Sequence, residues 1–302
     1  MPKPTRVKLV EVGPRDGLQN EKQPVSTSIK VELIHRLQEA GLKHIEVTSF
    51  VSPKWVPQMS DGVEVMTGIN RREEVCYSIL TPNMKGFELA LLSKPNEIVV
   101  FAAASETFSQ RNINCSIDES IDRFKPVVEA ALMQGIKVRG AISCVVGCPY
   151  EGLVPSGRVG QVAKKLKEIG VQHIGVADTI GVGTPIQLQN AMHSALEYYS
   201  VDDVSGHFHD TYGMALANIL ACLDLGIWQF DASVAGLGGC PYAKGATGNV
   251  ATEDVVYMLH GMGIDTGVNL GALVDAGEFI SKHLGRPSQS RVARALIGKR
   301  LA

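Results

Sequence analysis

The sequence predicts an α/β fold of the TIM-barrel class, a closed parallel (β/α)₈ barrel with additional C-terminal helices. Eight short runs rich in β-branched residues recur along the chain, separated by segments with apolar residues at three- and four-residue spacing, as helices over a sheet require. The unbroken alternation favours a parallel sheet, and 302 residues is close to the usual length of a closed barrel.

The eight predicted strands follow one another without a break that would mark a second domain. They are residues 6–12, 44–49, 75–80, 98–103, 137–143, 173–177, 204–209 and 229–234. The clearest predicted helices between them are residues 28–40, 119–133, 159–169 and 211–225. Residues 270–284 and 288–296 predict two more helices, separated by Gly285-Arg286-Pro287. We expect residues 1–302 to form one domain, with the helices of about 265–302 packed on the barrel or in a subunit contact.

The composition argues against several classes of function. The net charge is −2, and no block of lysines and arginines supplies the basic face that nucleic-acid binding needs. No apolar stretch reaches the ~18 residues of a membrane span, and neither end resembles a targeting signal. The six cysteines include no CxxC pair. We expect reduced thiols, a cytoplasmic location and no partner among membranes or nucleic acids.

Chemically versatile residues gather where the predicted strands end, which is where a parallel barrel places its active site. His207 and His209 are two residues apart on one strand, so their side chains leave the same face. They are either a metal-binding pair or two polar residues at the barrel rim. Asp16 follows the first strand, which is separated from the seventh only by the eighth, and this favours a metal site.

Asn249 precedes the amphipathic residues 250–259, so it is either the N-cap of a helix or a fourth metal ligand through its amide oxygen. Two imidazoles, a carboxylate and an amide suit Mg²⁺, Mn²⁺, Zn²⁺ or Fe²⁺. The ligand types alone do not choose among these ions.

Two other features at the strand ends predict catalytic roles. Arg15 offers a fixed cation that can polarise a carbonyl and stabilise an enolate, with a salt bridge to Glu46 as the alternative interpretation. The glycine-rich residues 235–248 predict a mobile lid with Cys240 at its middle, and a thiol there can transfer a proton. The alternative for Cys240 is a structural cysteine.

Several of these segments together resemble the 3-hydroxy-3-methylglutaryl-CoA lyase family over nearly the whole chain. The similar segments are EVGPRDGLQN (11–20), IEVTSFVSPKWVPQM (45–59), ASETFSQRNIN (104–114), DTIGVGTP (178–185), HFHDTYG (207–213) and the segment around Cys240. The resemblance implies cleavage of a 3-hydroxy-3-methylglutaryl-CoA type thioester to acetyl-CoA and a 3-keto acid, as in leucine catabolism and ketone-body formation. An acyl-CoA is the implied partner, together with a homo-oligomer, either a dimer or a tetramer.

The resemblance also implies roles for individual residues. Asp16, His207, His209 and Asn249 would bind Mg²⁺ or Mn²⁺, Arg15 would clamp the carbonyl, and Cys240 would be the lid thiol. The CoA moiety would lie across the barrel mouth. The residues implied to complete the polar site or to contact CoA are Glu46, Asp178, Lys22, Arg111 and Asn112. Ser49, at the end of the second predicted strand, is a further candidate for a substrate contact.

Two positions depart from the mitochondrial members of the family. Ala141 stands where those proteins carry tyrosine, and Gly175 where they carry serine. Both differences remove bulk and a hydroxyl group, so we expect a roomier acyl pocket that accepts a C3 substituent larger than methyl, such as a branched isoprenoid chain.

Two other functions fit parts of the pattern. Condensing enzymes of the isopropylmalate and homocitrate synthase type share an arginine-aspartate start and an H-x-H strand, but usually lack the Gly-Cys-Pro-Tyr lid. A catalytically inert barrel used for binding is the second alternative, since a fold does not dictate its function.

Overall fold

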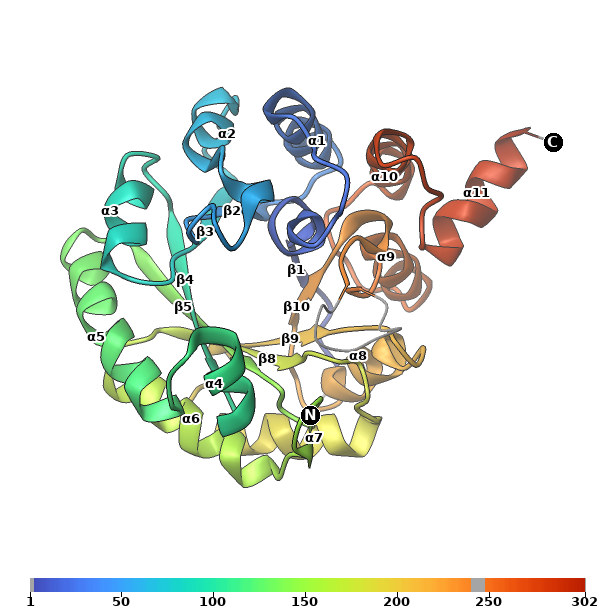
Figure 1. Cartoon of the computed structure of the whole chain (residues 1–302). Helices are drawn as coiled ribbons and strands as arrows, with labels where there is room; N and C mark the ends of the chain where they lie inside the picture. Colours follow the sequence, from blue (N-terminus) through green and yellow to red (C-terminus); the bar gives the residue numbers. More distant parts are fainter. Residues whose placement is uncertain (1–2, 240–247, 302) are drawn as a thin grey trace.

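The computed structural model describes residues 3–239 and 248–301, and it confirms the predicted barrel. Eight parallel strands close in the order β1-β10-β9-β8-β5-β4-β3-β2 (Figure 1). Their bounds are β1 Lys8–Glu11, β2 His44–Ser49, β3 Cys76–Leu80, β4 Glu97–Ala103, β5 Lys137–Ser143, β8 His173–Asp178, β9 Val204–Phe208 and β10 Gln229–Ala232. A small hairpin of β6 (Gly147–Cys148) and β7 (Gly152–Leu153) follows β5.

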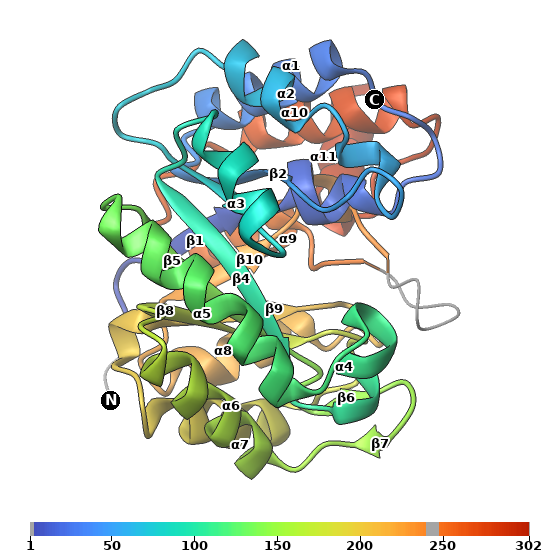
Figure 2. The ribbon, with the colours of Figure 1, turned by 60° about the vertical axis from the view of Figure 1, so that its left-hand side comes forward.

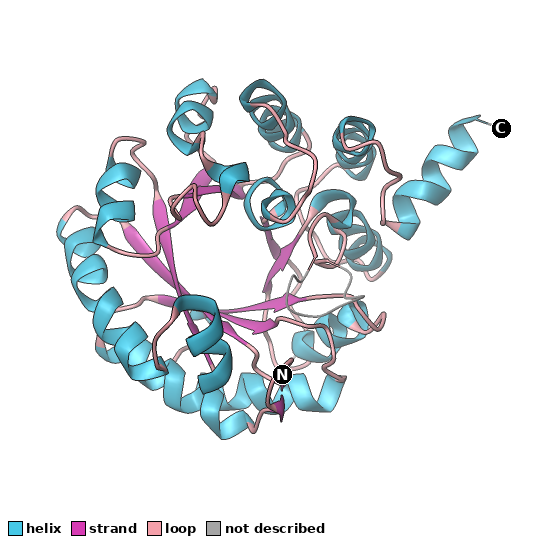
Figure 3. Cartoon of the chain, viewed as in Figure 1, coloured by secondary structure: helices cyan, strands magenta, loops and turns pink. Residues whose placement is uncertain are grey.

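Helices surround the strands as an outer ring (Figure 3). Each barrel strand is followed by one main helix, and α4 is an extra helix between β4 and α5. The helices are α1 Thr27–Glu39, α2 Gly62–Gly68, α3 Met84–Leu91, α4 Glu106–Ile113, α5 Ile117–Met133, α6 Ser156–Glu168, α7 Pro185–Leu196, α8 Ala215–Leu223, α9 Thr252–Gly261, α10 Leu270–His283 and α11 Arg291–Leu301. None of the helices in the described ranges is both long and apolar enough to cross a membrane.

The helix after β9 begins later than the sequence predicts. We expected it to start at residue 211, but α8 starts at Ala215 because a turn comes first. Gly213 closes this turn with a φ of +71°, a conformation that glycine adopts without strain. The Asp210 carboxylate then accepts a hydrogen bond from the Ala215 backbone N–H at 3.0 Å.

Apolar side chains fill the layer between strands and helices, whereas charged groups cross the barrel interior. The apolar layer includes the fully buried side chains of Leu33, Phe124 and Phe230. Inside the barrel, Arg139 of β5 reaches Asp231 of β10, although β8 and β9 lie between those strands. The interior is therefore a packed polar core beneath the strand ends.

Two helices, α10 and α11, follow the barrel in the sequence. The first, α10, contacts α1 and α9, and Figure 1 shows α11 at the outer edge of the ring. We predicted the last helix over residues 288–296, but α11 begins at Arg291 because Ser290 forms the turn that precedes it. The Ser290 hydroxyl donates to Asp254 of α9, and Asp254 also accepts from the Val292 backbone N–H at 2.9 Å.

Candidate metal centre and active site

The candidate site lies at the carboxyl ends of the barrel strands, where the loops after β1, β9 and β10 meet. The loop after β1 is a wide helical turn, Gly13–Gly17, that carries Arg15 and Asp16. A Cβ atom at Gly17 would lie 2.7 Å from the side chains of Ser233 and Leu237. Only glycine permits this approach, which brings the turn against the loop after β10.

Asp16, His207 and His209 form a cluster that is able to hold a metal ion. One ligand atom from each lies within 4.8 Å of the other two, and His207 Nε2 is 3.9 Å from Asp16 Oδ2. Two ligand atoms that share a cation at about 2.1 Å lie roughly 3 to 4.2 Å apart, so this spacing fits. The chain therefore brings together the three residues that the sequence predicted as a metal site.

An unpaired polar atom at the cluster also fits a bound cation. His209 Nδ1 is buried and has no hydrogen-bond partner among the residues that the structure describes. Buried polar atoms are rarely left without a partner, and a metal ion or its ligand shell would supply one. His209 itself follows the end of β9 and pairs with Asn249 through an isolated antiparallel bridge.

Asn249 is part of this cluster and is not a helix N-cap. The N-cap of α9 is Ala251, so that alternative is wrong. The Asn249 side-chain nitrogen donates to Asp16 Oδ2 at 2.7 Å and to the Leu237 carbonyl at 3.4 Å. A rotation of the terminal amide by half a turn would place its oxygen toward Asp16.

Arg15 is fixed from two sides. Its Nε and Nη2 donate to the two carboxylate oxygens of Glu46 at 2.7 and 3.1 Å, and its Nη1 donates to Asp16 at 2.7 Å. These bonds use three of the five N–H donors of a guanidinium, so two remain for a substrate oxygen. The salt bridge to Glu46 and a catalytic role are thus compatible, because the bridge orients the cation.

The local charges set the protonation of the cluster. Burial disfavours the charged form of Asp16, but Arg15 and the two imidazoles outweigh it and hold the pKa of Asp16 below its ordinary value. Burial, followed by the nearby His207, lowers the pKa of His209 to about 4. An ionised carboxylate and a neutral imidazole are the forms that bind metals.

His207 has a different environment from His209. Burial would lower its pKa, yet the hydrogen bond to Asp231 and the charges of Asp231 and Asp16 raise it. His207 Nδ1 lies 3.0 Å from Asp231 Oδ2. Our sequence interpretation missed Asp231, for which the only signal is a single carboxylate in the otherwise uncharged strand of residues 229–234.

Glu11 connects the loops that carry the site, and our sequence interpretation also missed it. Its Oε1 accepts from the backbone N–H groups of Gly13 and Val234, each at 2.8 Å, and its Oε2 accepts from the Thr252 hydroxyl at 2.7 Å. One carboxyl group thereby joins the loops after β1 and β10 to the start of α9. Burial raises the pKa of Glu11 to about 7, in spite of these hydrogen bonds.

Two predicted site residues lie at other strand ends. Asp178, the last residue of β8, accepts from the backbone N–H groups of Val182 at 3.2 Å and Gly183 at 2.8 Å, so it orders the following loop. Burial raises its pKa. Ser49, the last residue of β2, is fully buried, and its hydroxyl has no partner among the described residues.

The residues predicted to contact CoA lie at the surface. Lys22, Arg111 and Asn112 are exposed, and the Arg111 guanidinium stacks on the Tyr150 ring at 4.7 Å from its centre. Arg111 belongs to α4, which Figure 2 shows beside the β6–β7 hairpin at one end of the barrel. None of the three is in the cluster of Asp16 and the histidines. Cys240, the predicted lid thiol, lies outside the described residues.

The two positions predicted to enlarge the acyl pocket are neighbours. Ala141 of β5 pairs in register with Gly175 of β8. A Cβ atom at Gly175 would lie 2.9 Å from Arg139 Nη2 and 3.4 Å from Ser205 Oγ. The space beside Gly175 is therefore filled by the Arg139 side chain, so Ala141 is the better candidate for added room.

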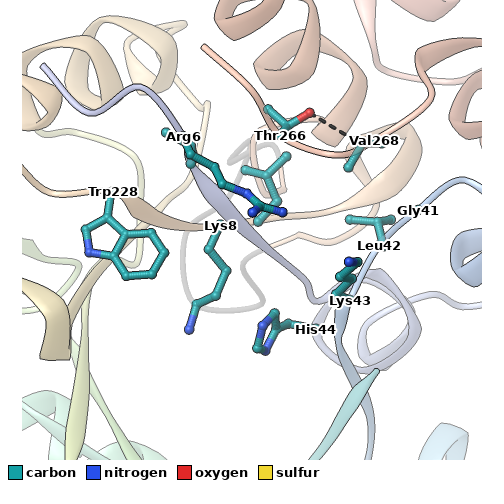
Figure 4. A pocket seen from close by; sticks show the side chains of 11 residues that line it. Arg6, Lys8, Gly41, Leu42, Lys43, His44, Trp228, Thr266 and Val268 are labelled. Carbon is teal, nitrogen blue, oxygen red and sulfur yellow. Dashed lines mark hydrogen bonds between the residues drawn. The ribbon is translucent and has the colours of Figure 1, made fainter. Parts of the chain in front are cut away.

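Cavities lined by described residues lie at the far end of the barrel and beside the metal cluster. One has a volume of about 360 Å³ and is lined by Arg6, Lys8, Lys43, His44 and Trp228 among others (Figure 4). These residues begin or precede β1, β2 and β10, so this cavity is at the end of the barrel opposite the site. A cavity of about 560 Å³ lies beside Asn249, between the loop after β9 and the start of α11.

Comparisons with known proteins agree with this geometry. The HMGL-like family profile matches residues 6–280. A lyase of Pseudomonas aeruginosa named for 3-hydroxy-3-isohexenylglutaryl-CoA and hydroxy-methylglutaryl-CoA is 57% identical over 98% of this chain and 99% of its own length.

Solved structures agree as well. The crystal structure of hydroxymethylglutaryl-CoA lyase from Pseudomonas aeruginosa has a TM-score of 0.97 at 57% identity, covering 99% of this chain and 100% of that one. An HMG-CoA lyase from Acinetobacter baumannii, solved in complex with coenzyme A and 3-methylmalate, has a TM-score of 0.93 at 37% identity, covering 96% and 95%. The chain belongs to the HMGL-like family.

Proposed function

We propose that this protein is a hydroxymethylglutaryl-CoA lyase, which splits 3-hydroxy-3-methylglutaryl-CoA into acetyl-CoA and acetoacetate. The observation that carries the proposal is the cluster of Asp16, His207 and His209 beside an arginine that Glu46 holds in place. The similarity to lyases named for this reaction supports it.

The ligands and the ion are part of the proposal. Asp16, His207 and His209, with the amide oxygen of Asn249 after rotation, would hold Mg²⁺ or Mn²⁺, which prefer carboxylate and carbonyl oxygens. A divalent cation held there would supply Lewis-acid chemistry that makes the C3 hydroxyl of the substrate more acidic.

Bond cleavage in the proposed reaction requires a group that accepts a proton, a group that stabilises the enolate and a group that donates a proton. A base takes the proton of the C3 hydroxyl, the C2–C3 bond breaks, and C3 becomes the ketone of acetoacetate. The electron pair passes to C2 and the thioester carbonyl as an enolate, and protonation of C2 completes acetyl-CoA. The lowered pKa of Asp16 keeps its carboxylate ionised and makes it a weak base, so we assign it mainly to metal binding.

Arg15 is proposed to stabilise the enolate oxygen. Its guanidinium is held by Glu46 and Asp16, so no reorganisation is needed when the negative charge develops. Cys240 is proposed, on sequence grounds alone, to assist the protonation of C2. Lys22, Arg111 and Asn112 are proposed to contact CoA.

The acyl pocket is proposed to accept a C3 substituent larger than methyl. Ala141 lies two residues beyond Arg139 on β5, so it shares the face of Arg139, and its small side chain adds little bulk there. The name of the Pseudomonas aeruginosa relative, which includes the isohexenyl substrate, supports this proposal. The cytoplasmic location and the dimer or tetramer stay predictions of the sequence.

The direction of the reaction is tested by offering both sets of reactants. We expect acetoacetate and acetyl-CoA to form from hydroxymethylglutaryl-CoA, and no thiol release from acetyl-CoA with a 2-keto acid. Thiol release from that second mixture, with no cleavage of hydroxymethylglutaryl-CoA, would identify a condensing enzyme instead. Inactivity in both assays with Mg²⁺ and with Mn²⁺ would favour a binding protein.

A further inference from the structure

We infer that Asp231, held in place by Arg139, is a positioning residue that orients His207 for the metal. The inference rests on the proposed function, because it explains how the chain prepares one of the proposed ligands. It concerns two residues that lie outside the ligand cluster itself, on β10 and β5.

The contact between Asp231 and His207 selects one form of the imidazole. His207 Nδ1 lies 3.0 Å from Asp231 Oδ2, and a carboxylate only accepts hydrogen bonds. Nδ1 must therefore carry a proton and donate it. In the neutral ring this leaves the lone pair on Nε2, the nitrogen that lies 3.9 Å from Asp16.

Arg139 keeps Asp231 in the form that this role requires. Its Nη2 lies 2.6 and 2.7 Å from the two oxygens of Asp231, so both oxygens act as acceptors. The side chains of Arg139 and Asp231 are only 5% and 6% exposed, which leaves little room for another arrangement. The same Nη2 donates to Ser205 Oγ at 2.7 Å.

Gly175 leaves space for the Arg139 side chain because it has no side chain of its own. A side chain at Gly175 would meet Arg139 Nη2 at 2.9 Å, as described above, so the glycine lets the guanidinium pass across the barrel. Arg139 thereby spans from β5 to β10, and Asp231 extends the support to His207 on β9. His207 is thus braced by the barrel interior rather than by a surface loop.

The two histidines differ in this respect. Among the described residues, His209 Nδ1 has no hydrogen-bond partner, whereas His207 Nδ1 has a carboxylate. Partners of this kind orient metal-binding imidazoles, and their loss typically weakens metal affinity by about 10- to 100-fold. We therefore expect metal affinity to depend on Asp231 even though it is not one of the proposed ligands.

The test is the dissociation constant for Mn²⁺ alone, measured by electron paramagnetic resonance on the full-length protein. Asp231→Asn removes the negative charge at nearly constant shape and leaves a single acceptor oxygen for both Arg139 and His207, so we expect a roughly 10- to 100-fold weaker Kd. Ser205→Ala is the matched control, because it removes another partner of the same Arg139 nitrogen without touching His207. Its Kd should stay within about threefold of wild type.

Kinetics separate positioning from a general structural defect. At saturating Mn²⁺ the Asp231→Asn protein should recover most of the wild-type kcat, while the Mn²⁺ concentration at half-maximal rate rises by the same factor as Kd. An unchanged Kd in Asp231→Asn, with wild type binding Mn²⁺, would overturn the inference alone. Absence of Mn²⁺ binding in wild type would instead overturn the proposed metal site.

A second measurement needs no Asp231 variant, in case that protein does not fold. Long-range ¹⁵N–¹H spectra of histidine-labelled wild type with Mg²⁺ report which ring nitrogen carries the proton, and the signal missing in His207→Ala assigns His207. We expect the proton on Nδ1. A proton on Nε2 would contradict the inference.

Discussion

Asp16 and His207 come from opposite ends of the barrel sequence, yet Asp16 Oδ2 lies 3.9 Å from His207 Nε2. Between them stands only β10 in the ring, since β1 pairs with β10 and β10 with β9. Closure of the barrel therefore creates the site, because the two residues become near neighbours only when the first and last strands pair.

Removal of a proposed ligand should weaken metal binding strongly. In His207→Ala we expect Mn²⁺ affinity to fall by about 100-fold or more, since loss of a direct ligand should cost at least as much as loss of its supporting partner. Titration calorimetry measures this directly. His193→Ala, on the exposed surface of α7, is the control and should bind as wild type does. Equal affinities in the two variants would remove His207 from the site.

Arg15 should matter for the chemical step more than for the metal. Lysine at this position keeps the charge but loses the paired hydrogen bonds to Glu46, so we expect kcat to fall by about 100- to 1,000-fold in Arg15→Lys. The Kd for Mn²⁺ should change little. Arg286→Lys, which alters the ion pair with Glu21, is the matched control. An Arg15→Lys protein with wild-type kcat would argue against the enolate clamp.

Ala141 should control the size of the accepted substituent. In Ala141→Tyr, the added ring fills space on the face shared with Arg139, so kcat/KM for a long branched C3 group should fall by at least about 10-fold relative to the methyl substrate. A substrate panel with varied C3 groups gives the ratio. If both substrates keep their relative rates, the roomy-pocket proposal fails.

Glu253 should make stability depend on pH. Burial raises its pKa to about 8, so the folded protein retains this proton between about pH 4.5 and 8 while the unfolded chain has lost it. The stabilisation is thus complete below about pH 4.5 and disappears as the pH rises through about 8. Glu253→Gln keeps an acceptor for the Ala235 backbone N–H and has no such proton to lose.

The corresponding measurement is Tm from pH 5 to 9 for both proteins. We expect the difference in Tm between Glu253→Gln and wild type to shift in favour of Glu253→Gln as the pH rises, by roughly 3 °C or more at pH 8.5. Glu278→Gln, which changes an ion pair with Lys282 on α10, should follow the wild-type curve. Parallel curves for Glu253→Gln and wild type would show that Glu253 is already ionised at pH 5.

The sequence was sufficient for the strands and for the clustering of Asp16, His207 and His209 because both follow local rules. Alternation places His207 and His209 on one face, and the barrel brings strand ends together. The partnership of Arg139 with Asp231 follows no local rule, since it depends on which residues of β5 and β10 face each other across the interior. For the same reason, the contact between Gly175 and Arg139 could not be predicted from the sequence. This contact indicates that Gly175 leaves space for the Arg139 side chain.

The most direct test of the whole account is cleavage of hydroxymethylglutaryl-CoA before and after removal of divalent metal. We predict that chelation stops the formation of acetoacetate, that Mg²⁺ or Mn²⁺ restores it in wild type, and that neither ion restores it in His207→Ala. Acetoacetate formation that persists in the chelated wild-type enzyme would contradict the metal-centred mechanism.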